Sequence, residues 1–365
     1  MKKKRLIIFM PSIEGGGVEK NLFIISNYLA IRFDKTILIT TSRKFNNKFN
    51  NLKIINPNFK FNNNHGRKLR YFYCLFELFK LLIKKENFIL FAFQANLYCA
   101  LMGLFFPNLK IITRSNSAPF GWSKNFLKKL IFKILFKRIN LVIVNSEQFK
   151  KDLKKEFKVN AICIYNPLNL KEIKKKSKER IHFEFFNTKD LKIINIGRLV
   201  DQKDQLTFLK ALNLIKEKIK FRALIIGSGI KKSCLQEYIM QHKLNSKVKI
   251  INFKTNPYKY LSRSNLLVHT AIFEGLPNVL LEAISLNKYI ISTNCSTGPS
   301  EILSNGKGGD LIKLYDFKEL AKKILFYNFN QRKLIKKKKF AYKNLYRFDY
   351  ELNLKKYYFE IKKFI

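Results

Sequence analysis

Short apolar runs of strand length alternate with segments of helical periodicity through the first half of the chain. The runs end in polar or glycine-containing turns, and the segments between them repeat their apolar positions with the period of a helix. Expected strands lie at residues 6–10, 36–41, 88–93, 110–113, 141–145 and 162–165, and expected helices at 18–31, 69–85 and 97–106. Strands that alternate with helices predict a parallel sheet with helices on both faces.

The same pattern restarts after a turn at Asn166-Pro167 and a lysine-rich stretch at 171–180, with expected strands at 191–196, 222–226, 248–252, 266–269 and 289–293 and helices at 205–218 and 279–286. A chain of 365 residues suits two domains. We therefore expect an α/β architecture of two Rossmann-like βαβ domains that face each other across a cleft. The expected boundaries are 1–170 for the N-terminal domain, 171–189 for a linker, 190–340 for the C-terminal domain, and 341–365 for a helical segment that packs back on the first domain.

One uncharged stretch, residues 88–107, has the length of a membrane span. Gln94 and Asn96 interrupt it near the middle, so we interpret it as a buried strand, a loop and a buried helix, with a membrane span as the alternative. The basic start of the chain resembles a signal peptide, but the apolar run that follows ends at Pro11. That run is too short for an export signal and has the length of a buried first strand.

Composition narrows the class of protein. Hydrophobic residues make up 47% of the chain and aromatic residues 14%, which excludes a long disordered protein. Lys and Arg number 72 against 25 Asp and Glu, a formal net charge of +47. Lys, Asn, Ile and Phe are frequent even in loops, which is typical of an AT-rich genome, so no specific nucleic-acid partner is expected. The charge still favours attraction to an anionic membrane surface.

Five scattered cysteines without a CxxC pair indicate neither a zinc site nor disulfides, and they favour a reducing cytoplasm.

A glycine-rich loop follows the first expected strand and opens the first helix. Gly15, Gly16 and Gly17 allow a close approach of the backbone to a ligand, and a helix N-terminus attracts anions. A phosphate is the expected ligand, and the alternative is a tight turn that binds no ligand. The pattern is neither GxGxxG nor GxxxxGK[ST], so a dinucleotide or Walker-type site is not indicated.

Two cations follow the first strand of the second half. Arg198 and Lys203 lie just after residues 191–196, and ligands of open α/β sheets bind beyond the carboxyl ends of the strands. Arg could clamp a diphosphate through its planar fork and Lys as a point charge. Because the chain is so basic, their position at a strand end is the informative feature.

Two acids bracket the segment FEGLPNVLLEA, residues 273–283. Gly275 and Pro277 would hold Glu274 in a loop, with Asn278 as N-cap of the next helix and Glu282 about one turn inside it. Carboxylates accept hydrogen bonds from the paired hydroxyls of sugars. The alternative is stabilisation of acids by the helix dipole, which suits Glu282 better than Glu274.

Other candidate groups are weaker. His269 ends a strand just before Glu274 and is more typical of a structural histidine than of a catalytic one. No DxD motif is present in the sequence, so we expect no carboxylate-held metal.

Together these segments resemble the retaining glycosyltransferases of family 4, which have the GT-B fold. The likeness covers nearly the whole chain: GGGVEK (15–20), NSEQFKKDL (145–153), YNP (165–167), GRLVDQKD (197–204), FEGLPNVLLEA (273–283) and STGPSEIL (296–303). The Glu-x7-Glu element is the most specific of these. The Gly-Pro-Ser-Glu segment and residues 113–116 look most like bacterial members that move N-acetylhexosamine or galactose units in surface-glycan and lipid-linked glycan assembly.

The resemblance implies roles for individual residues. The nucleotide diphosphate would lie between Gly16-Gly17 and the pair Arg198 and Lys203. Backbone amides after Glu274 would help to hold the phosphates, with Gly275, Asn278 and Val279 on the donor side. Glu274 would face the hydroxyls of the donor sugar, and Glu282 would take those of the ribose.

The resemblance also implies a reaction. It is a retaining, metal-independent transfer from a nucleotide sugar, expected to be a UDP sugar, to a glycan or polyprenyl-diphosphate-linked acceptor at the cytoplasmic face of the membrane, with no further cofactor. Many family members carry a histidine where this chain has Arg114 and Asn116, which become acceptor-side candidates. The alternatives are a UDP-sugar 2-epimerase of the same architecture and a basic membrane- or RNA-binding protein.

A second expectation for the membrane comes from residues 125–138. One helical face gathers Phe126, Leu127, Leu130, Ile131, Ile134 and Leu135, with lysines beside it. Such a helix suits an anionic lipid interface. Phe132 and Phe136 lie off this stripe and would favour lipid contact over packing on the sheet, which is the alternative.

Overall fold

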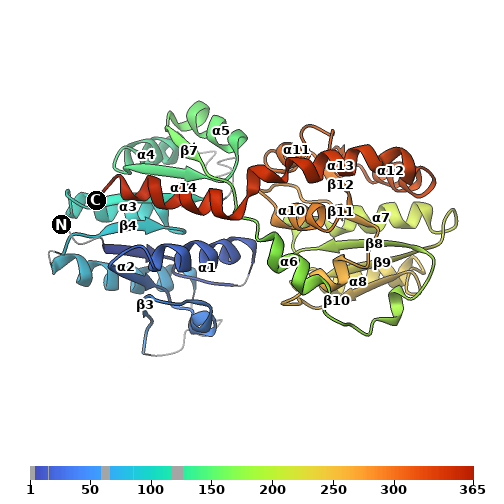
Figure 1. Ribbon diagram of the computed structural model, residues 1–365, viewed down its shortest axis with the longest axis horizontal. Coiled ribbons are helices and arrows are strands. Elements are labelled where there is room, and N and C mark those ends of the chain that lie inside the picture. Colours follow the sequence, from blue (N-terminus) through green and yellow to red (C-terminus); the bar gives the residue numbers. More distant parts are fainter. Residues whose placement is uncertain (1–4, 15, 59–65, 85, 117–125) are drawn as a thin grey trace. The chain divides into compact units, whose positions relative to one another are not determined.

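The computed structural model describes residues 5–14, 16–58, 66–84, 86–116 and 126–365 (Figure 1). The chain divides into two compact units. The first combines residues up to Pro167 with Tyr350–Ile365, and the second is Leu168–Asp349. Each unit is built on a parallel β-sheet with helices, so the expectation of two Rossmann-like domains is confirmed.

The sheet of the first unit has the strand order β3-β2-β1-β4-β5-β6-β7. Its strands are β1 (Arg5–Phe9), β2 (Lys35–Ile39), β3 (Lys53–Ile55), β4 (Ile89–Ala92), β5 (Lys110–Ser115), β6 (Leu141–Val144) and β7 (Ala161–Cys163). All are predicted strands except β3, a three-residue edge strand within a polar, asparagine-rich connection.

Helices cover both faces of this sheet because neighbouring strand residues point to opposite sides. They are α1 (Gly17–Ala30), α2 (Arg67–Ile83), α3 (Asn96–Phe105), α4 (Phe126–Phe136), α5 (Glu147–Phe157) and α14 (Tyr350–Lys362), with the 3₁₀ helix η1 (Arg43–Lys48). Ile7 and Phe9 of β1 pack with α2, α3, α4 and α5, whereas Leu6 and Ile8 pack with α1 and α14.

The uncharged stretch at 88–107 forms β4 and α3, as the sequence predicts. Among the described residues, no helix combines the length and the apolar character that crossing a membrane requires.

The sheet of the second unit has the order β10-β9-β8-β11-β12-β13, also parallel. Its strands are β8 (Leu191–Ile196), β9 (Phe221–Ile226), β10 (Val248–Ile251), β11 (Leu266–His269), β12 (Tyr289–Thr293) and β13 (Asp310–Ile312). Its helices are α6 (Leu170–Ser177), α7 (Gln205–Ile215), α8 (Lys232–Gln241), α9 (Tyr258–Leu261), α10 (Asn278–Ser285), α11 (Pro299–Ile302), α12 (Phe317–Phe329) and α13 (Ile335–Lys343), with the 3₁₀ segments η2 (Glu184–Phe186), η3 (Asp201–Lys203), η4 (Gln331–Leu334) and η5 (Asn344–Phe348).

The division between the units differs from the expected boundaries. The segment expected as a linker, 171–189, belongs to the second unit and contains most of α6. Asn169 caps this helix, and Ile173 is buried, so the lysine-rich stretch is the solvated face of a packed helix. The return to the first unit begins at Tyr350 and not at 341.

Both sheets reverse their strand order at one point, between β1 and β4 in the first unit and between β8 and β11 in the second. Ligands of open α/β sheets bind at such switch points, beyond the carboxyl ends of the strands. Gly16 follows β1, Arg198 and Lys203 follow β8, and Glu274 follows β11. The predicted site residues therefore lie where this architecture places its binding sites.

Candidate functional site

Glu274 lies at the centre of a group of charged and polar side chains beyond the carboxyl end of β11. Its side chain is buried, with 9% of the residue exposed. Lys203 forms an ion pair with Glu274 Oε1, and the Nε2 atom of His269 lies 3.1 Å from the same oxygen. The sequence predicted Lys203 after one strand and His269 and Glu274 at the end of another, but not the contact between them.

These contacts set the charge of the carboxylate. Burial alone would raise the pKa of Glu274, but the Lys203 ammonium and the hydrogen bond from His269 outweigh it and lower that pKa to about 2. Burial lowers the pKa of His269, which favours its neutral form. At neutral pH Glu274 is therefore a charged group that can only accept hydrogen bonds, as sugar hydroxyls require.

Hydrogen bonds to backbone carbonyls connect the segment of Lys203 to the loop of Glu274. The amide of Ile272 donates to the Gln202 carbonyl at 2.8 Å, and Gln202 Nε2 donates to the Phe273 carbonyl at 2.9 Å. The hydroxyl of Thr270 donates to the Lys203 carbonyl at 3.0 Å. Hydrogen bonds thus connect the segment after β8 directly to the loop after β11.

The turn before α11 supports the backbone of Glu274 from the other side. Thr297 Oγ1 donates to the Glu274 carbonyl. Gly298 has φ of +86°, and a Cβ atom there would lie 2.2 Å from the Gly275 carbonyl oxygen. Only glycine fits this close approach. The Ser-Thr-Gly-Pro segment, predicted as a turn into a helix, therefore shapes the candidate site.

Arg198 lies on the same loop as Lys203. Its side chain is exposed, with Nη2 3.3 Å from Gln202 Oε1, and its carbonyl accepts from Gln205 Nε2 at 2.9 Å. The structure thus places both predicted cations at the carboxyl end of β8. Lys203, however, forms its ion pair with Glu274. From the sequence we expected Lys203 to face phosphate and Glu274 to face sugar hydroxyls.

Helix α10 begins one residue earlier than the sequence indicates. Pro277 is extended, with φ of −70° and ψ of 106°, and is the N-cap, whereas Asn278 is already helical. The prediction of Asn278 as N-cap is therefore wrong. Asn278 and Val279 occupy the N-terminal end of α10, directly after the loop that carries Glu274 and Gly275.

Glu282 lies one turn into α10 and is 7% exposed. Its Oε1 atom accepts a hydrogen bond of 3.1 Å from the hydroxyl of Tyr258, a buried residue that begins α9. Tyr258 could not be predicted from the sequence, because only folding brings residues of α9 and α10 together.

In the first unit, Gly16 is the N-cap of α1 and Gly17 its first residue, whereas Gly15 lies outside the described residues. The carboxylate of Glu19 folds back over this loop, and its Oε1 atom lies 3.5 Å from the amide of Glu14. A negative group thus already lies at the helix end where the sequence predicts a phosphate. A phosphate bound there would have to displace or share this position.

Arg114, expected on the acceptor side, is fully buried in the first unit. Nε donates to the Tyr357 hydroxyl at 2.8 Å, and Nη2 donates to Asn166 Oδ1 at 2.6 Å. This position argues against direct contact with an acceptor and indicates that Arg114 joins β5 to α14. Asn116 is half-buried at the same strand end and donates to the Phe93 carbonyl at 3.3 Å.

Helix α4 contains the residues for which we expected contact with an anionic membrane surface. Leu130, Ile131 and Ile134 are exposed by 46%, 53% and 57%. Leu135 and Phe136 are buried in the core and Phe132 packs against that core, so the inference of lipid contact from the two aromatic residues was wrong. The side chains of Phe126 and Leu127 lie outside the described residues.

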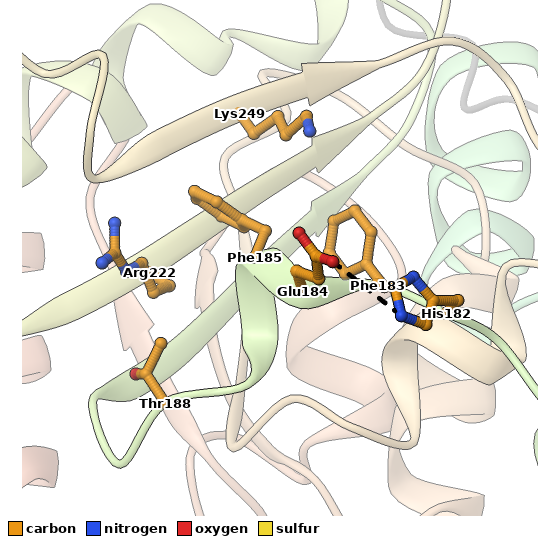
Figure 2. A pocket seen from close by; sticks show the side chains of 7 residues that line it. All are labelled: His182, Phe183, Glu184, Phe185, Thr188, Arg222 and Lys249. Carbon is orange, nitrogen blue, oxygen red and sulfur yellow. Dashed lines mark ion pairs between the residues drawn. The ribbon is translucent and has the colours of Figure 1, made fainter.

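A separate cavity of about 550 Å³ lies in the second unit, near the amino-terminal ends of strands and not the carboxyl ends (Figure 2). It is lined by His182, Phe183, Glu184, Phe185, Thr188, Arg222 and Lys249. Arg222 and Lys249 are near the amino-terminal ends of β9 and β10. This cavity is therefore distinct from the site around Glu274. In the described part of the chain, no group of three or more His, Cys, Asp or Glu side chains could hold a metal ion.

Part of the chain is similar to known glycosyltransferases. Residues 176–344 match the family model for glycosyl transferases group 1. The chain is similar to an uncharacterized glycosyltransferase of Methanocaldococcus jannaschii, at 31% identity over 229 residues, 58% of this chain and 55% of the relative. It is also similar to the N-acetylgalactosamine-N,N'-diacetylbacillosaminyl-diphospho-undecaprenol 4-alpha-N-acetylgalactosaminyltransferase of Campylobacter jejuni, at 27% identity over 226 residues, 60% of each chain.

These two alignments span 55% and 60% of the relatives' own length. The fold likeness extends further: the Anabaena protein HepE, solved in complex with UDP and glucose, matches with a TM-score of 0.79 at 16% identity over 99% of this chain and 100% of that one. The fold is thus shared with a protein of known structure. Residues 176–344, which hold Arg198, Lys203, Glu274 and Glu282, are the part that matches the group 1 glycosyl transferases.

Proposed function

We propose that this protein is a retaining glycosyltransferase of family 4 that moves a hexose or N-acetylhexosamine from a UDP sugar to a glycan or lipid-linked glycan. The observation that carries the proposal is the buried carboxylate of Glu274, held by Lys203 at the switch point of the second sheet. That site lies inside the segment that matches the group 1 family.

The chemistry follows from the charges at this strand end. The nucleoside diphosphate gains negative charge as the glycosidic bond breaks, and Arg198, Lys203 and the amides at the start of α10 can stabilise that charge where it forms. These cations do the work of a divalent ion, so the transfer is metal-independent and needs no further cofactor. Glu274 holds hydroxyls of the donor sugar, and Glu282 those of the ribose.

Retention of the anomeric configuration belongs to the same proposal. We assign Glu274 to the hydroxyls of the donor sugar and not to nucleophilic attack on its anomeric carbon. Attack by the acceptor hydroxyl on the face that the diphosphate leaves would retain the configuration. The share of Gly16 and Gly17 in donor binding stays a prediction.

The choice of donor and acceptor draws on the relatives. HepE was solved with UDP and glucose, which supports a UDP sugar. The name of the Campylobacter jejuni relative includes transfer of N-acetylgalactosamine to a diphospho-undecaprenol glycan, which supports a lipid-linked acceptor. Such an acceptor requires work at a membrane surface. We assign this contact to the exposed residues Leu130, Ile131 and Ile134 of α4, at the cytoplasmic face.

The test is a transfer assay with a panel of UDP sugars and a polyprenyl-diphosphate-linked acceptor, followed by NMR of the product's anomeric configuration. We expect an acceptor-dependent product with the configuration of the donor. Conversion of the UDP sugar without acceptor would instead identify a 2-epimerase. Inversion of configuration would refute the retaining mechanism.

A further inference from the structure

His269 is the buried histidine at the end of β11, with 3% of its surface exposed. Its Nε2 atom lies 3.1 Å from Glu274 Oε1, and its Nδ1 atom lies 3.2 Å from Ser292 Oγ on the neighbouring strand β12. The imidazole thus bridges the sheet and the candidate carboxylate. Neither the Glu-x7-Glu element nor the proposed mechanism assigns it a task.

The protons of this chain of contacts can be assigned. A carboxylate only accepts, so a favourable contact with Glu274 requires a proton on Nε2. The ring is then either doubly protonated, with Nδ1 donating to Ser292 Oγ while that hydroxyl donates to the Thr293 carbonyl at 3.1 Å, or neutral, with the Ser292 hydroxyl turned from that carbonyl to donate to Nδ1. An imidazolium would be buried beside the Lys203 ammonium, with one carboxylate to balance two cations. Burial lowers the pKa of His269 although the contact with Glu274 raises it, and Lys203 lowers it further, so that the pKa stays below its ordinary value. The neutral Nε2–H tautomer satisfies both ring nitrogens without a second buried cation, and its cost is the weak bond from the Ser292 hydroxyl to the Thr293 carbonyl.

This contact has a consequence for the two oxygens of Glu274. Lys203 and His269 both bind Oε1. Among the described residues, no hydrogen bond to Oε2 is recorded. Two donors on one oxygen fix the rotation of the carboxylate and leave the other oxygen for a ligand hydroxyl.

We infer that His269 is a positioning residue, which donates from Nε2 to Oε1 of Glu274 and thereby presents Oε2 to a hydroxyl of the donor sugar. The inference rests on the proposed transferase function. His269 acts through Glu274 and has no proton to exchange with the substrate. Its loss should therefore change turnover with the sugar donor while the binding of UDP, which lacks the sugar, stays the same.

The kinetic test compares His269→Leu, which removes the donor, with His269→Gln, which keeps an N–H near the position of Nε2. Removal of a hydrogen bond to a charged group should lower kcat by about 10- to 100-fold, and we expect His269→Gln to recover most of this loss. UDP affinity by calorimetry should stay within about twofold of the parent protein in both variants. His242→Gln, at the end of α8 in the same unit, is the matched control.

An NMR measurement separates this inference from the proposed function. Two-bond ¹⁵N–¹H spectra of histidine-labelled protein should show His269 neutral, with its proton on Nε2, from pH 6 to 8. A proton on Nδ1 alone, or an imidazolium in this range, would overturn the assignment even if transfer occurs. If the parent protein transfers no sugar but the tautomer is as expected, the proposed function fails and the contact stands.

Unchanged kcat in His269→Leu, or an equal loss of UDP affinity, would refute the positioning role. If His269→Leu does not fold, His269→Gln and the spectra decide.

Discussion

Replacement of Glu274 by Gln should strengthen the binding of UDP while it weakens catalysis. The substitution keeps the size of the side chain and its ability to accept from His269, but it removes the negative charge that Lys203 faces. In the proposed donor complex, the diphosphate competes with this carboxylate for the lysine ammonium of the parent protein. In Glu274→Gln the ammonium is available to the phosphates alone.

The magnitude follows from the burial of the pair. The two side chains are only 17% and 10% exposed, so an effective dielectric constant of about 20 applies, and two charges about 4 Å apart then interact by roughly 4 kcal/mol. The ammonium can touch carboxylate and phosphate at once, so only part of this energy appears in binding. We take the value of one charge-assisted hydrogen bond, roughly 1.5–3 kcal/mol. That range predicts UDP affinity about 10- to 100-fold higher in Glu274→Gln.

Calorimetric titration of UDP into Glu274→Gln, Lys203→Met and the double variant tests this reasoning. Lys203→Met should weaken UDP binding, and in its background Glu274→Gln should have almost no effect. Glu319→Gln, which removes the acid of a partly exposed Lys–Glu pair on α12, controls for the change in net charge. If Glu274→Gln loses UDP affinity as Lys203→Met does, Glu274 binds the nucleotide directly and the competition does not exist.

Four further outcomes are expected. Glu282→Ala should weaken UDP binding by about 10- to 100-fold and Tyr258→Phe by about 2- to 10-fold, measured by calorimetry; no loss in either would exclude a ribose contact. Because the folded pKa of Glu274 is depressed to about 2, its ionisation stabilises the fold above about pH 4.5, and this contribution is lost as the pH falls towards 2. Urea unfolding of the parent and of Glu274→Gln should therefore converge over that interval, and a constant difference would contradict the pKa. Transfer should persist in excess EDTA, whereas loss restored by Mn²⁺ would establish a metal requirement. Ile131→Asp with Ile134→Asp should reduce co-sedimentation with anionic vesicles without a change in Tm, and unchanged sedimentation would remove α4 as the contact.

The sequence predicts most strands and the position of the candidate site for a physical reason. Parallel strands covered on both faces are mostly apolar, so β1 and β8 are visible as short apolar runs. The cations or glycines that follow these runs mark the carboxyl ends of the strands. The edge strand β3 lacks this signal because it is three residues long and lies among asparagines. The lysine-rich stretch misleads for the opposite reason, since the buried face of α6 depends on a few side chains such as Ile173.

Contacts between distant side chains are beyond a reading of the sequence. The partners of Arg114 are 52 and 243 positions away, and those contacts convert a candidate acceptor residue into a buried link. Lys203 and Glu274 are 71 positions apart, and Tyr258 and Glu282 are 24 apart. Residue type and strand order bring such groups to one edge of a sheet, but only the packed structure decides which atoms meet.

The return of α14 to the first unit has a consequence for biosynthesis. Leu354, Tyr357 and Ile361 are fully buried against the face of the sheet that α1 covers, and Tyr357 also receives a hydrogen bond from Arg114. The second unit, Leu168–Asp349, is continuous in sequence and can complete its core as soon as it leaves the ribosome. The first unit is synthesised earlier but lacks one layer of its core until residues 350–365 emerge. The domain made first is therefore the last to be completed, and the face of its sheet beside α1 lacks part of its cover until α14 has been synthesised.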